Sequence, residues 1–326
     1  MAQKLRIVVA GAGAVGSVFG GKLAAAGHDV LLVGRDPHMA AIARGGLRIT
    51  GIFGETRARP RTATDLAGSA EPFDVALVSV KSHATETAAR ALAAWPEPPP
   101  LVVSLQNGLG NVEALARALG GERVLGARVI FGAVVRSPGH AHVTVNAKPV
   151  AIGPLRAAAT IDARAGAIAT LVDAAGIPCE AVPAVEPLLW EKALYNCGLN
   201  PLGALNGLTY GEVVASATLR RELEEAIREG FAVARAAGIG LAWPTAEDFL
   251  EYFYTTLIPP TAGHRSSMRQ DLEAGRRTEV DAIGGAIVRA GARCGVPTPA
   301  NARLVAAVRE AEQSRLEPPE RPPEAR

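Results

Sequence analysis

The fold is decided by the stretch LRIVVAGAGAVGSVFGGKLAAA, which occupies residues 5–26. Its first part, Leu5–Ala10, is a short apolar run that predicts a buried β-strand, and its last part, Ser17–Ala26, predicts a helix. Between them stands Gly11-Ala12-Gly13-Ala14-Val15-Gly16, which has the spacing G-x-G-x-x-G. A strand, a glycine-rich turn and a helix in this order are typical of a site for the phosphates of a dinucleotide.

Each glycine of this segment has a physical task. Gly11 allows a tight turn, Gly13 allows the backbone to approach a pyrophosphate, and Gly16 allows the helix to pack closely on the strand. The N-terminus of the helix adds unpaired N–H groups and a partial positive charge. The segment therefore predicts dinucleotide binding, and a glycine-rich turn without a ligand is the structural alternative.

The residue after the second predicted strand bears on which nicotinamide dinucleotide is bound. Arg35 stands at about the distance from Gly11, roughly 20 residues, at which an acidic residue would bind a free ribose 2′-hydroxyl. A planar guanidinium suits a 2′-phosphate instead, so Arg35 favours NADP over NAD. Asp36 is the opposing signal, and a solvated surface charge is the alternative for Arg35.

Outward from this stretch, the first half of the chain alternates between short apolar runs and helical segments. The runs predict buried parallel strands at Val30–Val33, Val75–Val80 and Leu101–Leu105. The helical segments are Met39–Arg44, Ala84–Ala94 and Val112–Leu119. Val124–Val135 and His142–Ile152 alternate in polarity and predict antiparallel strands at one edge. This pattern indicates a Rossmann-type parallel sheet with helices on both faces.

After Gly153-Pro154 the pattern becomes almost entirely helical. The predicted helices are Asp162–Ala175, Val185–Leu199, Leu219–Ala237, Thr245–Thr255 and Thr278–Ala292. The α/β half followed by a helical block predicts two domains, an NADP-binding domain over residues 1–183 and an all-α substrate and catalytic domain over 184–316. Residues 317–326 are rich in proline and charge and are predicted to form a disordered tail.

The composition is that of an ordinary globular protein. Of 326 residues, 48% are apolar and 20% are charged, and the net charge is +2. Balanced charge and only 4% aromatic residues count against nucleic acid as the main partner. The sequence has no signal-peptide pattern and no apolar run of the ~18 residues that a membrane helix needs. Cys179, Cys197 and Cys294 lie far apart and predict free thiols, so we expect a cytoplasmic protein without a membrane partner.

Polar residues follow two of the predicted parallel strands. Lys81 comes directly after Val75–Val80, and Gln106-Asn107-Gly108 follows Leu101–Leu105. In an open parallel sheet, ligands bind beyond the carboxyl ends of the strands, so Lys81 and Asn107 are expected at the cofactor. The structural alternatives are an exposed strand end for Lys81 and ordinary turn chemistry for the Asn-Gly pair.

The helical half carries a polar line on one predicted helix. Lys192, Asn196 and Asn200 are each four residues apart, so they share one helix face, and their neighbours are apolar. This arrangement favours a cleft wall, with a water-facing stripe as the alternative. Pro201 disfavours helical geometry at the residue before it, so the helix is expected to end or bend there.

Two further segments combine polar groups with helix starts. In Ser266-Ser267-Met268-Arg269-Gln270-Asp271, a serine before a helical run is most often an N-cap. In Arg276-Arg277-Thr278-Glu279-Val280-Asp281, Thr278 and Asp281 have the spacing of a capping box. By this interpretation Glu279 is a favourable acid in the first helical turn.

Taken together, these residues resemble the ketopantoate reductase (2-dehydropantoate 2-reductase) family. The matching features run from Gly11 to Asp281. Besides the glycine segment, they are Arg35, Lys81, Gln106-Asn107-Gly108, Trp190-x-Lys192, Asn196, Asn200-Pro201-Leu202, Ser266-Ser267-Met268-x-x-Asp271 and Arg277-Thr278-Glu279. The resemblance implies NADPH-dependent reduction of 2-dehydropantoate to (R)-pantoate, on the way to pantothenate and coenzyme A.

The resemblance also implies roles for single residues. Lys192 matches a general acid that hydrogen-bonds the ketone oxygen, and Glu279 matches a carboxylate that holds the substrate and helps to orient Lys192. Asn196, Asn200 and Ser267 match substrate-binding groups. Arg35 and Lys81 match contacts to the cofactor phosphates, and Asn107 matches a residue beside the nicotinamide that touches both ligands.

One departure from the family pattern leaves alternatives open. Family members often carry Asn before the Gly-Glu pair that here is Gly211-Glu212, and this chain has Tyr210; the segment Val129–Val145 also matches loosely. Reduction of another branched 2-oxo acid is therefore the second hypothesis, and a non-catalytic NADP-binding regulator is the third. His140 and His142 have no third metal ligand nearby, so no metal is expected. A homodimer is one assembly that this interpretation allows.

Overall fold

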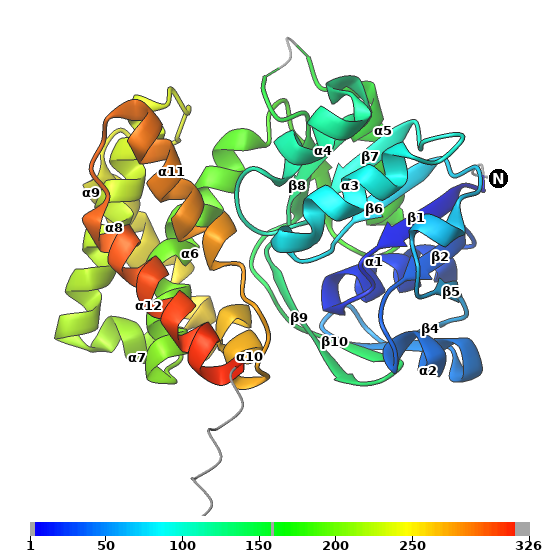
Figure 1. Ribbon diagram of the computed structural model, residues 1–326, viewed down its shortest axis with the longest axis horizontal. Helices are drawn as coiled ribbons and strands as arrows, with labels where there is room; N and C mark the ends of the chain where they lie inside the picture. Colours follow the sequence, from blue (N-terminus) through cyan, green and yellow to red (C-terminus); the bar gives the residue numbers. More distant parts are fainter. Residues whose placement is uncertain (1–3, 158–159, 317–326) are drawn as a thin grey trace, which may run out of the picture. The chain divides into compact units, whose positions relative to one another are not determined.

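The computed structural model describes residues 4–157 and 160–316. The chain divides into two compact units, and the division falls between Lys192 and Ala193, inside helix α6 (Glu186–Asn206) (Figure 1). The first unit is α/β and the second is helical, which confirms the predicted fold class. The predicted disordered tail, residues 317–326, lies outside the described residues.

The first unit is built on an eight-stranded sheet. Its strands are β1 (Arg6–Ala10), β2 (Asp29–Val33), β5 (Arg61–Ala63), β6 (Val75–Val78), β7 (Leu101–Ser104), β8 (Val124–Arg128), β11 (Val150–Gly153) and β12 (Cys179–Ala181). Their order is β12-β11-β8-β7-β6-β1-β2-β5. The strands from β8 to β5 are mutually parallel, whereas β11 is antiparallel to β8. The four predicted parallel strands are confirmed, and the short strands β5 and β12 were not predicted.

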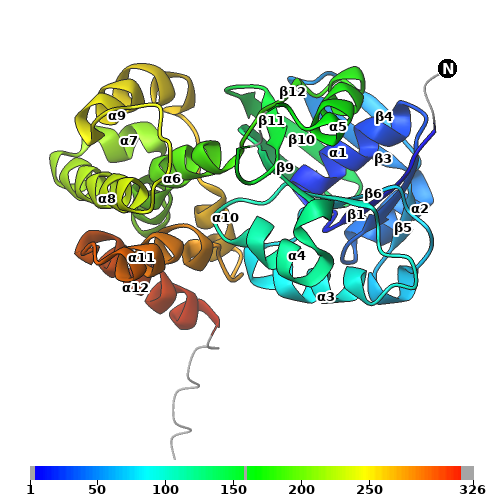
Figure 2. The same cartoon turned by 90° about the horizontal axis from the view of Figure 1, so that it is seen from above.

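Helices cover both faces of this sheet, as Figure 2 shows. The helices are α1 (Ala14–Ala25), α2 (His38–Gly45), α3 (Thr85–Ala93), α4 (Asn111–Leu119) and α5 (Ala163–Ala174). Alternate residues of β1 supply two separate cores. Ile7 and Val9 pack with residues of α1, α2 and α5, whereas Val8 and Ala10 pack with residues of α3, α4 and the start of α6. This two-sided burial explains why the strands read as continuous apolar runs.

A second, four-stranded sheet belongs to the same unit and corrects the prediction of two edge strands. Its strands are β3 (Leu47–Gly51), β4 (Thr56–Ala58), β9 (Phe131–Ser137) and β10 (His140–Asn146), in the order β4-β3-β10-β9. The predicted strand 124–135 is divided between β8 and β9, and the predicted strand 142–152 between β10 and β11. Each divided strand crosses from one sheet to the other, which polarity alternation alone does not reveal.

Helix α1 is packed between the two sheets. A Cβ atom on Gly20 would lie 2.3 Å from Leu32 of β2, and one on Gly21 would lie 2.6 Å from Ile49 of β3. Phe19 is fully buried, and its ring centroid lies 5.8 Å from that of Phe131 on β9. Because both sides of α1 are covered, this helix has no polar face.

The second unit is a helical bundle that contains the end of α6. Its further helices are α7 (Tyr210–Ala215), α8 (Ala217–Ala236), α9 (Ala246–Tyr252), α10 (Ser267–Glu273), α11 (Gly284–Cys294) and α12 (Pro299–Leu316). Helix α8 contacts α7, α9, α11 and α12 and is the centre of the unit. A π-helical turn, Phe253–Leu257, extends α9. In the described part of the chain, no helix combines the length and apolarity that crossing a membrane requires.

Phe19→Ala is expected to lower the free energy of unfolding of the first unit by about 3–5 kcal/mol, because it leaves a cavity between two sheets. Urea unfolding followed by circular dichroism measures the change. The control is Val135→Ala, which removes a side chain that is 41% exposed on β9 and is expected to shift the free energy by less than about 0.5 kcal/mol. Equal losses in the two variants would contradict this packing of α1.

Candidate active site

The turn between β1 and α1 can be built only with glycine at its ends. Gly11 has a φ angle of +105°, and a Cβ atom on it would lie 2.4 Å from the backbone nitrogen of Val80. A Cβ atom on Gly16 would lie 2.4 Å from the carbonyl oxygen of Gly11 and 2.5 Å from Ser79 Oγ. The predicted strand–turn–helix context of residues 11–16 is therefore present, with α1 pressed directly against the ends of β1 and β6.

Gly13 differs from these two glycines because its surroundings are open. It is the N-cap of α1, no side chain caps the helix there, and a Cβ atom on Gly13 would meet no atom within 4 Å. Helix α1 thus begins beside open space and without a capping side chain, and the free N–H groups and the dipole of a helix start give a partial positive charge there. This geometry fits a pyrophosphate.

The loop after β2 contains Arg35 and Asp36. Arg35 is exposed, and within the described residues no acidic group pairs with its guanidinium. The Asp36 carboxylate accepts a hydrogen bond at 2.9 Å from the backbone N–H of Ala40, so one of its oxygens is already used to cap α2. The arginine is therefore the more available of the two side chains for a ligand.

His38 ties this loop to the rest of the unit. Its Nδ1 accepts a hydrogen bond from the backbone N–H of Gly139 at 3.0 Å, and its Nε2 lies 3.0 Å from Ser17 Oγ on α1. Burial lowers the pKa of His38, which favours the neutral ring that the Gly139 contact requires, since a protonated Nδ1 cannot accept. The Arg35 loop is thus anchored to both α1 and the β9–β10 hairpin.

The carboxyl ends of β6 and β7 bring together the predicted polar residues of this sheet. Lys81 is half-buried beside a short 3-10 turn, Ser82–Ala84. The carbonyl oxygen of Asn107 accepts hydrogen bonds from Asn111 Nδ2 at 2.8 Å and from Ser82 Oγ at 3.0 Å. Asn107 is therefore held in place through its backbone, and its side chain remains available for other contacts.

A buried hydrogen-bond chain supports Asn111 in turn. Thr85 Oγ1 donates to Asn111 Oδ1 at 2.8 Å and accepts from Gln106 Nε2 at 2.6 Å, and Ser104 Oγ donates to Gln106 Oε1 at 3.1 Å. All four side chains are less than 10% exposed. Gln106 is thus a structural residue, and the sequence pattern did not predict the roles of Asn111, Thr85 and Ser104. The spacing of four between Asn107 and Asn111 was the available signal.

Lys192 lies on α6 and reaches this same edge of the sheet. Its Nζ donates to Asn107 Oδ1 and to the carbonyl oxygen of Val129, which directly follows β8. The ammonium is therefore directed by two oxygen acceptors from the ends of neighbouring strands. The sequence predicted both Lys192 and Asn107, whereas the backbone acceptor at Val129 has no sequence signature.

Asn196 and Asn200 follow Lys192 along α6, at the spacing that the sequence predicted. Both are buried, with 7% and 4% exposed area. Among the described residues, no group forms a hydrogen bond with the Asn196 side chain, whereas Asn200 Oδ1 accepts from the Tyr210 hydroxyl at 2.7 Å. Of the two expectations for Pro201, an end or a bend of the helix, the end is wrong, because α6 continues through Pro201 to Asn206. Proline lacks only one helical N–H, and the surrounding bundle maintains the helix.

The two serines before α10 have different roles. Ser266 is fully buried and is the N-cap of α10, since its Oγ accepts from the backbone N–H of Arg269 at 3.0 Å. Ser267 is the first residue of the helix, and its hydroxyl has no partner in the described part of the chain. The N-cap interpretation therefore applies to Ser266 and leaves Ser267 available for a ligand.

The capping box predicted for Thr278 and Asp281 is wrong. The backbone N–H of Thr278 donates to Glu312 on α12 at 2.6 Å, and Asp281 pairs with Arg277 and Arg309. Helix α11 begins only at Gly284, after a 3-10 turn over Val280–Ala282. Glu279 precedes this 3-10 turn and is buried, with 7% exposed area, so it is not an acid in the first turn of α11.

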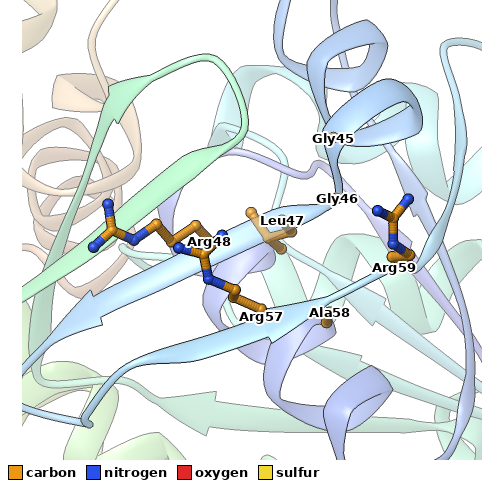
Figure 3. A pocket seen from close by; sticks show the side chains of 7 residues that line it. All are labelled: Gly45, Gly46, Leu47, Arg48, Arg57, Ala58 and Arg59. Atoms are coloured by element: carbon orange, nitrogen blue, oxygen red, sulfur yellow. The ribbon is translucent and has the colours of Figure 1, made fainter.

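A pocket of about 300 Å³ lies elsewhere on the first unit, at the C-terminal end of α2 and the β3–β4 pair (Figure 3). Three arginines line it, Arg48, Arg57 and Arg59. Arg48 and Arg57 lie 3.0 Å and 3.6 Å from Glu55, which partly neutralises them. The residues singled out in the sequence are not among its lining residues.

The histidine pair on β10 is bound to a threonine of the neighbouring strand β3. Thr50 Oγ1 on β3 lies 2.8 Å from His140 Nε2 and 2.8 Å from His142 Nδ1. Burial, the largest cause, and nearby Arg136 lower the pKa of both rings. Across the described ranges, no cluster of three or more His, Cys, Asp or Glu residues could hold a metal ion.

Gly13→Ala is expected to weaken binding of NADPH by at least about tenfold, because a methyl group would occupy the space that a pyrophosphate approaches. Titration of the protein with NADPH, followed by nucleotide fluorescence, measures the affinity. Thermal stability is expected to be unchanged, since the added methyl group meets no protein atom. The matched control is Gly166→Ala, which adds a methyl group in equally open space on α5. An unchanged affinity in Gly13→Ala would exclude this turn as the phosphate site.

Comparison with known proteins relates both units to one family. The N-terminal model described as "Ketopantoate reductase PanE/ApbA" matches residues 7–157, and its C-terminal counterpart matches residues 184–312. The 2-dehydropantoate 2-reductase of Aquifex aeolicus is 35% identical over 300 residues, covering 91% of this chain and 94% of that protein.

Solved structures extend this comparison to the fold. A PanE/ApbA family ketopantoate reductase from Ralstonia eutropha JMP134 superposes with a TM-score of 0.84 at 33% identity, covering 96% of this chain and 100% of that one. A D-mandelate dehydrogenase in complex with NADH gives a TM-score of 0.83 at 25% identity, covering 95% and 99%. On the match of both units and the relatives above 30% identity, the chain belongs to the ketopantoate reductase family.

Proposed function

We propose that this chain catalyses the NADPH-dependent reduction of 2-dehydropantoate to (R)-pantoate, a step toward pantothenate and coenzyme A. The observation that carries the proposal is the Lys192 ammonium, which is directed by Asn107 and Val129 at the carboxyl edge of a parallel sheet. The turn between β1 of the same sheet and α1 fits a pyrophosphate. Family membership and the names of the relatives support the substrate.

The residues present fit a phosphorylated dinucleotide. The open space at Gly13 and the uncapped start of α1 would receive the pyrophosphate, and Arg35 would bind the 2′-phosphate. Lys81, at the end of β6, would add a second cation for the phosphates. When bound, the nicotinamide supplies the hydride that reduces the keto carbon.

Lys192 would act on the ketone oxygen. Negative charge develops on that oxygen as the carbon is reduced, and a positioned ammonium stabilises it and then donates a proton. Asn107, which is held through its backbone by Asn111 and Ser82, keeps the ammonium directed at the edge of the sheet. This removes the cost of orienting the cation during the reaction.

The substrate-binding roles of four residues rest on the family resemblance. Asn196, Asn200 and Ser267 are each buried or half-buried and carry polar atoms that no described protein group occupies. Such atoms are costly unless a ligand or water pairs with them. Glu279 is also buried and is assigned to substrate binding. That Glu279 helps to orient Lys192 stays a prediction.

Lys192→Met is expected to lower kcat by about 100- to 10,000-fold, the usual contribution of a general acid. The affinity for NADPH is expected to remain within about threefold, because the side chain is assigned to the substrate oxygen and not to the cofactor. Steady-state kinetics and an NADPH titration check the two parts. A kcat near that of the wild type would remove Lys192 from the mechanism.

Arg35→Ala is expected to raise KM for NADPH by about 10- to 100-fold, since hydrogen bonds to charged groups contribute about 1.5–3 kcal/mol. KM for NADH is expected to change far less, because NADH has no 2′-phosphate. The matched control is Arg44→Ala, which removes another exposed arginine at the opposite end of α2. Equal effects on the two cofactors would show that Arg35 does not select between them.

A second candidate function is the reduction of another branched 2-oxo acid on the same scaffold. It is favoured by Tyr210, which bonds the proposed substrate residue Asn200 where family members often carry Asn. A structural relative named D-mandelate dehydrogenase shows that proteins of this fold act on more than one substrate, which agrees with this second candidate.

The deciding experiment is NADPH oxidation by the purified protein with 2-dehydropantoate and a panel of other 2-oxo acids, with NADH as the control cofactor. A clear preference for 2-dehydropantoate and NADPH is the expected result. Preference for a different acid supports the second candidate. NADPH binding without turnover of any oxo acid would refute both and support the non-catalytic regulator.

We further propose that the reaction takes place in the cytoplasm. Cys179, Cys197 and Cys294 are free thiols, as expected in a reducing compartment. Burial raises the pKa of Cys179 and of Cys197 to about 12, so these two thiols stay protonated and unreactive. Assembly as a homodimer stays a prediction.

A further inference from the structure

Tyr210 lies in the second unit and is almost fully buried, with 4% exposed area. Its hydroxyl donates to Asn200 Oδ1 at 2.7 Å, and both residues belong to the same unit. Within the described residues, the Asn200 Nδ2 group has no hydrogen-bond partner. The oxygen of this buried amide is therefore bound by Tyr210, and its NH₂ group can bind a ligand.

The tyrosine is itself held rigidly. It is the first residue of α7, whose N-cap Thr209 forms a capping box with Glu212. The Tyr210 backbone N–H donates to the carbonyl oxygen of His264 at 3.1 Å, and its ring lies edge-on to Tyr195, with ring centroids 5.7 Å apart. The position of the hydroxyl is thus set by backbone and ring contacts, independently of Asn200.

The orientation of the Asn200 amide follows from the hydroxyl. Burial keeps the pKa of Tyr210 well above its usual range, so the phenol retains its proton. If the amide were rotated by 180°, Nδ2 would donate to the phenol oxygen, and the phenol hydrogen would face no described acceptor in a buried place. A buried donor without an acceptor is energetically unfavourable. The orientation with Oδ1 on the hydroxyl is therefore strongly preferred.

We propose that Tyr210 is a positioning residue that locks the Asn200 amide so that its NH₂ group, and not its oxygen, faces the substrate. The proposal rests on the assignment of Asn200 to substrate binding under the proposed function. It makes Asn200 a dedicated hydrogen-bond donor, so the substrate must offer an oxygen acceptor at this point, as the carboxylate or hydroxyl oxygen of an oxo acid does.

The lock explains how Tyr210 replaces the asparagine that family members often carry. A phenol directs the neighbouring amide through a single hydrogen bond, and its ring fills the space beside Tyr195 and His264. The tyrosine acts through Asn200 and makes no contact of its own with the substrate in this proposal. Its removal should therefore weaken substrate binding and leave the chemical step nearly intact.

The test is Tyr210→Phe, which removes the hydroxyl and keeps the ring. KM for the preferred 2-oxo acid is expected to rise about tenfold, with kcat and KM for NADPH within about threefold of the wild type. The matched control is Tyr195→Phe. Tyr195 belongs to the same aromatic cluster, but its hydroxyl bonds Thr261 Oγ1 at 2.7 Å and not Asn200. This control is expected to leave all three constants unchanged.

A double-mutant cycle separates positioning from a general loss of structure. In the Asn200→Ala background, Tyr210→Phe is expected to have no further effect on KM, since the amide that it orients is gone. The proposal is overturned if Tyr210→Phe has the KM of the wild type, or if its effect is as large with Asn200→Ala as without. Thermal unfolding of the two Tyr→Phe variants is expected to be similar, because each loses one hydroxyl that makes a hydrogen bond to a side chain.

A measurement that needs no turnover distinguishes failure of this proposal from failure of the proposed function. The side-chain amide signal of Asn200 in the NMR spectrum is identified by its absence in Asn200→Ala. It is expected to move in Tyr210→Phe and to stay in place in Tyr195→Phe, whether or not any oxo acid is reduced. No movement in either variant would refute the lock even in an active enzyme. Movement without any turnover would instead refute the proposed function alone.

Discussion

The constraint on which the first unit depends is the close approach of α1 to strand-end backbone at its start and to side chains of both sheets along its middle. At its N-terminus, Gly11 and Gly16 bring the helix against the ends of β1 and β6 at distances that no Cβ atom tolerates. In its middle, Gly20 and Gly21 let it pack between the two sheets. The same closeness places the uncapped helix start, with its partial positive charge, at the carboxyl edge of the parallel strands. A turn that fits a phosphate and a tightly packed core are thus two consequences of one set of glycines.

Buried hydrogen bonds hold the polar residues at the carboxyl ends of β6 and β7 in place. Ser104, Gln106, Thr85 and Asn111 form a satisfied chain that ends on the backbone of Asn107. Fully satisfied buried networks specify one arrangement, because breaking any bond leaves an unpaired group in a low dielectric. Asn107 can therefore direct the Lys192 ammonium without being displaced by it. In the second unit, the Tyr210 hydroxyl donates to the Asn200 side chain. Each unit thus contains a proposed ligand-binding asparagine that neighbouring hydrogen-bond donors hold, Asn107 through its backbone and Asn200 through its side chain.

Several residues that looked alike in the sequence are separated by these contacts. Ser266 and Ser267 are adjacent serines before a helix, and only the first has its hydroxyl engaged as the cap. Asp281, which seemed suited to cap a helix, pairs with two arginines, whereas the neighbouring Glu279 is buried. The contacts that hold Thr278 and Asp281 come from Glu312 and Arg309, which lie more than 25 positions away in the chain.

The sequence by itself determined the parallel sheet, its glycine turn, the helical second half and the spacing of Lys192, Asn196 and Asn200. These features are local, since apolar runs, glycine positions and a period of four residues set them directly. Only the tertiary structure decided the second sheet, because Phe131–Ser137 and Leu47–Gly51 become strands through partners far along the chain. It likewise decided the continuation of α6 through Pro201 and the bond of Tyr210 to Asn200. Contacts between distant segments carry no periodic signal, so packing had to reveal them.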